Sequence, residues 1–545
     1  MKYRDQIDFK NIKFQFESAS RMIDLGNFNK SFELCLDIEE VLNNAVNKDS
    51  AQYSFLFYKL GMLFVDLGNM ASNMKASVLG IAIMESGNFE DILARESYYY
   101  NLGNAKSNLL QIKSEDETII KVELVRQLSE VNSLFWKSIL SCRKQGIEAQ
   151  PQYLVNLAIN LQKQHRCSEA LALYDQVIAM DLDIPQAWIS RSECLSLLSQ
   201  INNFSSIKQG REIALGFRNA SKSNKLPPTW AKYYSMRAEK IDRDIEKNCL
   251  DMGIDIEDDS HLDKQEYQSL SEYRKWCLDN FLSLSEHGLY CKCYGSARDN
   301  LTIPLTTRGI SGDFIYSMEK VLNRLKSEFG LARLMLFEYG VADIDNIIED
   351  EACYSELYDN ELLGINIEKL RTAFRICFGI LDKIGNAIAL LFDLQPRGKN
   401  NKVRNASFHT FWELDKKERV EKFNSYGNAG LIGLYSIACD LNYSLKGELN
   451  FYKQWRNALE HSFVFIYDDD KPEETQSLTN YYGKPEFISK AEFIESAEHV
   501  LQLTRSAIFS FAYAVRIKAE KEKANEAEHL FQYITIQRKN YVLNI

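Results

Sequence analysis

The chain has 545 residues, of which 45% are hydrophobic and 26% charged, with only 25 Gly and 8 Pro. This composition is typical of globular proteins and excludes a fibrous or disordered chain, and the length suggests about three domains. The formal net charge of −11 argues against a sequence-independent binder of long nucleic acid, which needs a broad basic face, but it does not exclude a small basic active site.

The sequence predicts neither a secretory segment nor a membrane span. The opening MKYRDQIDFKN has no apolar core, unlike a signal peptide. The most apolar stretch, 376–394, is interrupted by Asp382, Lys383 and Asn386, which disfavours a span. Eleven scattered cysteines indicate reduced thiols rather than a disulfide framework. We therefore expect a cytoplasmic protein with no membrane contact.

Residues 1–244 are predicted to form an α-helical repeat array. A Leu-Gly-Asn phrase recurs in this part, and the clearest repeat unit runs from Tyr153 to Trp188. The small residues Ala158 and Ala170 would let two antiparallel helices approach closely, and each pair must stack on its neighbours to bury its apolar face. This unit resembles the tetratricopeptide (TPR) repeat, whose period is about 34 residues. An irregular array of α-hairpins is the alternative.

Residues 245–264 are predicted to be an acidic linker. Apolar periodicity is lost there, and acidic residues cluster. The group formed by Asp258, Asp259, His261 and Asp263 resembles a set of metal ligands in composition, but we interpret it as a solvated part of the linker.

Residues 265–545 are predicted to form a second helical domain, which makes the whole chain all-α. Apolar residues recur there with the 3.6-residue period of helices, and Pro396 with Gly398 ends one of these stretches. The predicted helices span 313–329, 367–394, 428–441, 450–465 and 490–526.

Common cofactor signatures are missing from the sequence. There is no GxxxxGK[ST], GxGxxG, HExxH or CxxC, so nucleotide hydrolases, dinucleotide-binding folds and common zinc sites lack support. His287, Cys291 and Cys293 form an H-x3-C-x-C pattern without an evident second pair of ligands. We therefore expect no cofactor, with a structural zinc at these residues as the alternative.

Two of the seven histidines occupy the same frame, Arg-Asn-x-x-x-His. The copy at 404–409 follows a Pro/Gly turn and a basic loop, and no helix is evident before its histidine. The basic residues of this loop are candidates to contact RNA phosphates, and a solvated turn is the alternative. They are Arg397, Lys399, Lys402 and Arg404.

The copy at 456–461 lies in a predicted amphipathic helix. Trp455 and Leu459 begin an apolar stripe that continues through Phe463 and Ile466, and this stripe is expected to face the core. On the other side, Asn457 shares a face with His461, and Arg456 shares one with Glu460, because each pair is four residues apart. The polar groups therefore gather on the side of the helix that faces away from the core.

This second motif resembles the R-x4-6-H signature of HEPN domains, in the RNxxxH form found in many HEPN ribonucleases. Over about 273–520, a series of segments resembles one TPR-fused bacterial HEPN subfamily, in the same order. The segments are YRKWCLDNFLSLSEHGLY (273–290), RLKSEFGLARLMLFEY (324–339), IEKLRTAFRICFGILDKIGNAIALLF (367–392), NAGLIGLYSIACDL (428–441), RNALEH (456–461) and TRSAIFSFAYAVRIKAE (504–520).

The resemblance implies a metal-independent endoribonuclease, in which the RNA 2′-hydroxyl attacks the adjacent phosphate and leaves a 2′,3′-cyclic phosphate. His461 would move the proton, and Arg456 would stabilise the charge on phosphorus oxygens. Asn457 would orient the imidazole or the phosphate, and Glu460 would hold Arg456. The alternative is purely structural, with Arg456 paired to Glu460 and His461 in a polar core contact.

Two further inferences concern the surroundings of the motif. Asp382 and Lys383 interrupt an apolar helix and are candidates to support the site from a facing helix; an ordinary paired or solvent-facing position is the alternative. On one helix, Arg456 and His461 point about 140° apart and lie ~7.5 Å apart along the axis. The resemblance implies that a homodimer through the HEPN domain brings two such motifs into one cleft.

The sequence thus predicts an RNA endonuclease regulated by a TPR array that binds a protein or peptide. The resemblance implies a bacterial role in anti-phage defence or as a toxin-like effector. The alternative function is a non-enzymatic TPR/HEPN scaffold, or a dimerisation or nucleotide-binding module that acts with a separately encoded partner.

Overall fold

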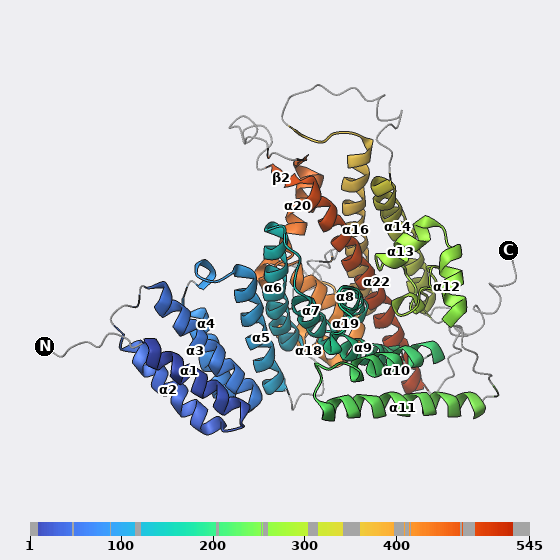
Figure 1. Cartoon of the computed structure of the whole chain (residues 1–545). Coiled ribbons are helices and arrows are strands. Elements are labelled where there is room, and N and C mark those ends of the chain that lie inside the picture. Colours follow the sequence, from blue (N-terminus) through green and yellow to red (C-terminus); the bar gives the residue numbers. More distant parts are fainter. Residues whose placement is uncertain are drawn as a thin grey trace. The chain divides into compact units, whose positions relative to one another are not determined.

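The structure, a computed structural model, is almost entirely helical wherever it is described (Figure 1), which confirms the all-α fold class. The chain divides into two compact units, one formed by 1–160 with 445–448 and the other by 161–444 with 449–545. The described residues are 9–45, 48, 50–87, 89–114, 121–202, 206–251, 253, 260–303, 314–341, 360–396, 408, 414, 416–468, 471 and 485–526.

The first unit is an array of helices in which consecutive helices pack as pairs, α1 with α2, α3 with α4 and α5 with α6. Its elements are α1 (Phe9–Asp24), α2 (Phe28–Asn43), α3 (Ala51–Met70), α4 (Met74–Glu85), η1 (Phe89–Asp91), α5 (Arg95–Ser114), α6 (Val122–Lys144) and most of α7 (Pro151–Lys163). The α3–α4 pair is especially close, because a Cβ on Gly68 would lie 2.7 Å from the backbone nitrogen of Ser77. Gly68 belongs to the recurring Leu-Gly-Asn phrase, which therefore marks a helix crossing.

The second unit begins with four helices that continue the helix–turn–helix pattern and pack in chain order. They are α8 (Cys167–Met180), α9 (Pro185–Asn202), α10 (Ile207–Ser221) and α11 (Pro228–Asp251). Both α8 and α9 also contact the long helix α22 (Lys490–Glu526). The boundary predicted at residue 244 falls inside this unit. The limits of the predicted repeat array and of the second helical domain remain a prediction.

A buried ion-pair network joins α8 to the C-terminal helices within the second unit. The Arg166 guanidinium, fully buried, lies 2.8 Å from a carboxylate oxygen of Glu169 and also pairs with Asp440 at the end of α19 (Ala429–Asp440). It donates a further hydrogen bond of 3.2 Å to the hydroxyl of Ser436. A charge removed from water is tolerated only when it is paired in this way.

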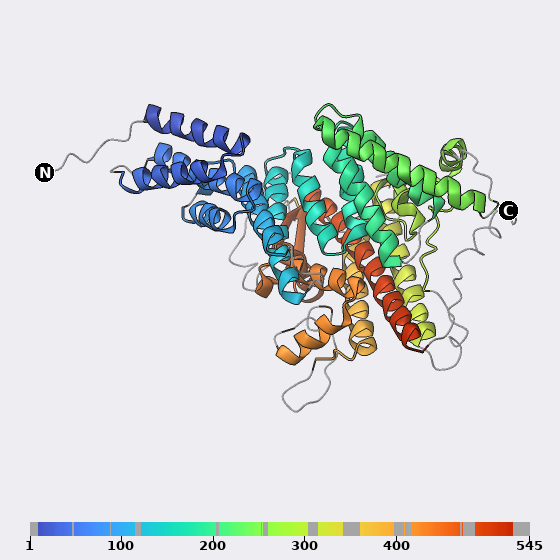
Figure 2. The same cartoon turned by 90° about the horizontal axis from the view of Figure 1, so that it is seen from below.

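The C-terminal part of the second unit is a helical bundle around α22, which packs against α14, α16 and α19 (Figure 2). Its remaining elements are α12 (Ser260–Ser269), α13 (Glu272–Asp279), η2 (His287–Leu289), α14 (Phe314–Val341), α16 (Ile365–Leu391), α18 (Lys417–Tyr426), η3 (Tyr443–Leu445), α20 (Asn450–His461), β1 (Val464–Tyr467) and β2 (Glu486–Ser489). Residue 445 itself belongs to the first unit.

The predicted helices are found, with two differences of more than three residues at their ends. Helix α14 continues beyond the predicted end at Phe329, through Gly330 to Val341, because Gly in a helix interior costs only about 1 kcal/mol and packing overrides that cost. The helix predicted for 450–465 stops at His461, and the chain enters β1, which pairs in parallel with β2. That prediction of a continuous helix was wrong.

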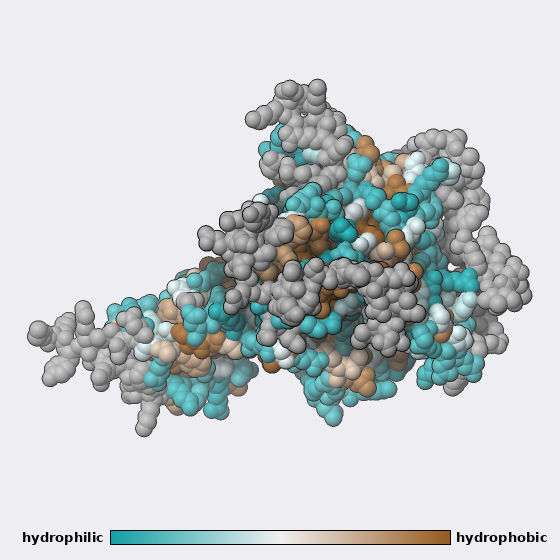
Figure 3. All heavy atoms as spheres, turned by 90° about the horizontal axis from the view of Figure 1, so that it is seen from above, coloured by the Kyte–Doolittle hydropathy of each residue, from teal (hydrophilic) through white to brown (hydrophobic). Residues whose placement is uncertain are grey.

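The predicted linker is helical at both ends, since α11 reaches Asp251 and α12 begins at Ser260. Asp258 and Asp259 lie outside the described residues. None of the helices in the described ranges combines the length and the apolarity needed to cross a bilayer. On the face shown in Figure 3, hydrophilic side chains surround separate brown patches of apolar ones.

Candidate active site

The RNxxxH motif lies on α20, whose inner side is anchored by aromatic packing. Tyr452, Trp455 and Ala458 are buried at spacings of three residues. The Trp455 ring lies 6.4 Å from that of Phe374 on α16 and 6.0 Å from that of Phe493 on α22. Because the inner face is held from two sides, the opposite face of α20 is directed outward with a defined orientation.

Arg456 lies on that outward face and is held by two side-chain contacts. Its Nη2 lies 3.0 Å from Oδ2 of Asp382 on α16, and its Nη1 donates to Oδ1 of the adjacent Asn457 at 3.1 Å. The side chains of Arg456 and Asp382 remain 29% and 36% exposed. The guanidinium is thus oriented by a carboxylate and an amide while part of it stays open to an anionic ligand.

Asp382 joins three segments of the chain. While Oδ2 accepts from Arg456, Oδ1 accepts a 2.9 Å hydrogen bond from the backbone nitrogen of Phe408. Phe408 belongs to the other RNxxxH copy, so a residue of each copy contacts the same carboxylate. The remaining residues of that copy lie outside the described residues, as do Arg397, Lys399 and Lys402.

The other predicted supporting residues lie elsewhere. Lys383 contacts Glu328 of α14, with 2.8 Å between Nζ and Oε2, and so belongs to a neighbouring ion pair. Glu460 is exposed, and within the described ranges Arg456 pairs with Asp382 and not with Glu460. The structure therefore brings Asp382 to the motif and does not bring Lys383 or Glu460 to Arg456.

His461 is exposed at the last residue of α20, and its imidazole forms no hydrogen bond with any described residue. The predicted inward stripe fails just beyond it, because Phe463 is 49% exposed. Once β1 begins, side chains alternate between faces, and Val464 and Ile466 become the buried ones. His461 therefore stands at a helix-to-strand junction and faces solvent.

The strand after His461 is fixed by hydrogen bonds from several segments. The Arg371 guanidinium donates to the backbone oxygen of Val464 at 3.0 Å, and the Leu362 nitrogen donates to that of Ile466 at 2.7 Å. Val464 and Glu486 are register partners in the parallel pair. These bonds hold the chain only a few residues beyond His461, so the end of α20 is anchored on both sides.

Lys453 is a part of the site that sequence reasoning missed. Burial lowers the pKa of its ammonium group, the positive charge of Arg456 lowers it further, and the Asp382 carboxylate opposes both effects. Two cations thus share one carboxylate, which leaves an excess of positive charge beside the motif. The available signal was the three-residue spacing from Lys453 to Arg456, which puts both on one helix face.

The arrangement offers a guanidinium, which can bind a phosphate, and an imidazole, which can transfer a proton. Among the described residues, the groups of side chains able to hold a metal ion lie around Cys293. Arg456 and His461 are five residues apart on one helix, so a single copy of α20 directs them about 140° apart.

A comparison with protein-family models matches residues 312–518 to the family described as LA2681-like HEPN. No curated protein matches the chain. The matched residues include α16, α20 and most of α22, and with them the Asp382–Arg456 pair and His461. Residues 312–518 are therefore similar to LA2681-like HEPN domains, which supports a HEPN domain in this part of the chain.

Proposed function

We propose that the protein is a metal-independent RNA endonuclease whose active site is built from Arg456, Asn457 and His461. The observation that carries the proposal is the half-exposed Arg456 guanidinium, which Asp382 and Asn457 orient, with an exposed histidine at the end of the same helix. A guanidinium in fixed orientation suits a phosphodiester, and an accessible imidazole suits proton transfer near neutral pH.

In the proposed reaction, His461 accepts the proton of an RNA 2′-hydroxyl as that oxygen attacks the adjacent phosphorus. The P–O5′ bond breaks, the leaving O5′ takes up a proton, and a 2′,3′-cyclic phosphate remains. Arg456 and Lys453 stabilise the added negative charge on the phosphoryl oxygens. Asn457 positions Arg456 and is near enough in the helix to contact the same phosphate.

The proposal includes a homodimer through the HEPN domain. One α20 cannot direct both Arg456 and His461 at one phosphate, whereas two copies related by a two-fold axis present the same surface to each other. The resemblance to TPR-fused bacterial HEPN proteins supports a role in anti-phage defence or as a toxin-like effector. The non-enzymatic scaffold is the competing function.

The test is RNA cleavage by the full chain in the presence of a chelator. Replacing His461→Ala should reduce the rate by about 10²–10⁴-fold, as loss of a general base does, and the wild-type product should end in a 2′,3′-cyclic phosphate. Glu460→Gln is the matched control, because Glu460 is also exposed on α20 but does not contact Arg456.

Two outcomes would reject this site. Unchanged cleavage by the folded His461→Ala variant would remove His461 from the mechanism. Loss of cleavage on His409→Ala alone would move the active site to the other motif. If the pure wild-type chain cleaves no RNA in any oligomeric state, the scaffold function is favoured.

We further propose that the helical array of the first unit binds a peptide ligand. A pocket of about 300 Å³ there is lined by four asparagines, which are Asn101, Asn104, Asn108 and Asn156. An asparagine amide can both donate to and accept from a peptide backbone. The amides are pre-oriented, since Asn156 donates to Asn104 at 2.7 Å and Asn101 donates to Tyr58 at 3.2 Å.

Asp66 adds a charge preference to this pocket. It lies among the lining residues, and its carboxylate can pair with a basic group of a ligand. Probing a peptide array with the full chain should select extended peptides that carry a basic residue. Asn104→Leu should weaken that binding by about tenfold or more; selection that is unchanged in this variant would contradict the proposed pocket.

A further inference from the structure

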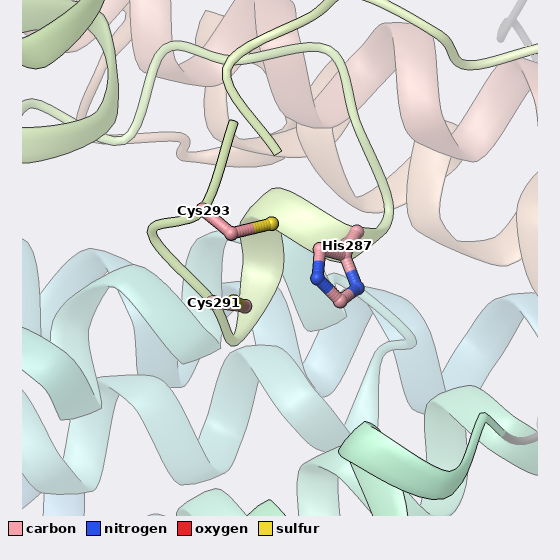
Figure 4. Close-up of side chains that lie close together, drawn as sticks. All are labelled: His287, Cys291 and Cys293. Atoms are coloured by element: carbon pink, nitrogen blue, oxygen red, sulfur yellow. The ribbon is translucent and has the colours of Figure 1, made fainter. Parts of the chain in front are cut away.

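A second cluster of reactive side chains lies outside the HEPN match, in the turn that follows α13. His287, Cys291 and Cys293 each contribute one atom to a group whose members all lie within 4.8 Å of one another (Figure 4). In Figure 4 the sulfur of Cys293 and the ring of His287 point toward each other across the turn. Both cysteines are buried, at 8% exposed each, and His287 is half-buried.

The turn is folded by its own hydrogen bonds. The Cys291 nitrogen donates to the His287 oxygen at 3.0 Å and so closes the chain back over η2. The Cys293 oxygen accepts from the Ser296 hydroxyl at 2.6 Å and from the Ser296 nitrogen at 3.2 Å. The three side chains are therefore brought together by a structured loop rather than by chance contact between long side chains.

Tyr290 orients the histidine. Its hydroxyl lies 3.2 Å from Nδ1 of His287 and 2.9 Å from the hydroxyl of Ser206, the residue that caps the N-terminus of α10. With Nδ1 engaged in this contact, Nε2 is the nitrogen that a metal ion would take. A hydrogen bond to the second ring nitrogen is the usual way in which proteins orient a metal-binding histidine.

Helix α12 brings carboxylates to the same place. Asp263 and Glu266 are three residues apart, and one oxygen of each lies within 4.8 Å of the Cys293 sulfur in a second group of ligand atoms. Asp263 forms an ion pair with Lys208, while Glu266 accepts a 2.8 Å hydrogen bond from the Tyr294 nitrogen. The two groups share Cys293, so Asp263 is a candidate for the fourth ligand that the H-x3-C-x-C pattern lacks in sequence.

We propose that His287, Cys291, Cys293 and Asp263 bind a structural zinc ion. Two thiolates, an imidazole and a carboxylate form a four-ligand set of the kind that holds tetrahedral zinc, and soft sulfur ligands disfavour magnesium and calcium. Zinc and Lys208 together supply three positive charges, which balance two thiolates and one carboxylate. Tetrahedral ligand atoms lie about 3.3–3.8 Å apart, so zinc binding would require the side chains of His287, Cys291 and Asp263 to close around Cys293, which belongs to both groups.

The proposed zinc would fasten α12 to a segment that already touches the core of the HEPN domain. Glu286, the residue before His287, pairs with Arg516 of α22 at 2.7 Å. Ser283, shortly before it, accepts through its backbone oxygen a 2.8 Å hydrogen bond from Arg505 of α22. The metal site would thus stabilise the chain between the helical repeats and the bundle, independently of RNA cleavage.

The experiment measures metal in the full chain purified from zinc-supplemented cells. We expect about one zinc per chain that survives dialysis, and none in the double variant Cys291→Ala/Cys293→Ala. Cys249→Ala is the matched control, because Cys249 is a buried cysteine of α11 outside the cluster, and it should retain zinc. Asp263→Asn should weaken zinc binding by at least about 10–100-fold, the effect of losing a group that only orients a ligand, and Glu266→Gln should not.

Cobalt substitution keeps the proposal testable if a variant fails to fold. Co²⁺ added to the metal-depleted wild-type chain should give thiolate-to-cobalt charge-transfer absorption and the intense visible bands of a tetrahedral site. Zinc far below one per chain together with no such spectrum would overturn the proposal, and so would a Cys291–Cys293 disulfide in the chain isolated under reducing conditions. A loss of zinc in Glu266→Gln but not in Asp263→Asn would overturn the assignment of the fourth ligand.

Discussion

Arg456 on α20 and Asp382 on α16 form an ion pair of 3.0 Å although they are 74 residues apart in the chain. The pair connects the helix that carries the RNxxxH motif to a helix that crosses the HEPN domain. Because Asp382 also accepts from the Phe408 backbone, it orients the guanidinium from a position that is itself held. This relationship makes Asp382 a positioning residue of the proposed site.

Replacing Asp382→Asn should reduce RNA cleavage by about tenfold while the chain stays folded. The change removes the charge that orients Arg456, and a half-exposed ion pair contributes only ~0–1 kcal/mol to stability. The measurement is kcat against KM for cleavage, together with the urea midpoint. Lys383→Gln is the neighbouring control, since Lys383 pairs with Glu328; equal cleavage by the two variants would contradict the positioning role.

Gly430→Ala should strongly destabilise the second unit. A Cβ at this position would lie 2.7 Å from the Cα of Ala514 and closer to its backbone nitrogen, so α19 and α22 would have to separate. Overpacking of this kind costs about 1–3 kcal/mol or more. Gly330→Ala in α14, where a Cβ would meet nothing within 4 Å, should instead stabilise by about 0.4–1 kcal/mol. Urea unfolding that shows the two variants equally stable would refute this packing argument.

Arg166→Met should cost about 3–5 kcal/mol, because it leaves the Glu169 and Asp440 carboxylates buried without their cation. The control is Arg218→Met, which breaks a more exposed pair with Asp242 and should cost less than about 1 kcal/mol. Adding Asp440→Asn to Arg166→Met should recover part of the loss, as measured by chemical unfolding. A double variant no more stable than Arg166→Met would contradict this account.

His165 should make the folded chain sensitive to mild acid. Burial lowers the pKa of this imidazole to about 4, and its Nδ1 is buried without a hydrogen-bond partner among the described residues. The unfolded chain takes up a proton below about pH 6.5, whereas the folded chain does so only near pH 4. The stability that depends on neutral His165 is therefore complete above pH 6.5 and is lost as the pH falls toward 4.

The variant His165→Asn tests this pH dependence. Asn tolerates the left-handed backbone found at this position, where φ is 59°. Between pH 7 and pH 5 the wild type should lose about 1 kcal/mol more unfolding free energy than the variant. One pKa unit corresponds to about 1.4 kcal/mol, and the expected loss is reduced because the His165 side chain is partly exposed. Parallel pH profiles for the two proteins would show that another group controls acid stability.

The sequence alone predicted the helices and the RNxxxH motif because both depend on local information. The apolar period of 490–526 matches α22 at both ends, and the motif at 456–461 lies on a helix as expected. The end of α20 could not be predicted in the same way. The apolar stripe continued through Phe463 and Ile466, and only pairing with β2, more than twenty residues later, turns this segment into a strand.

The identity of the charged partners was decided by tertiary structure. Helical spacing favoured Glu460 as the partner of Arg456, but the packing of α16 against α20 brought Asp382 there instead. The H-x3-C-x-C pattern lacked a fourth ligand until α12 placed Asp263 beside Cys293. Helical periodicity depends on neighbouring residues, whereas contacts between distant segments depend on how whole helices pack. The sequence of either segment alone does not determine that packing.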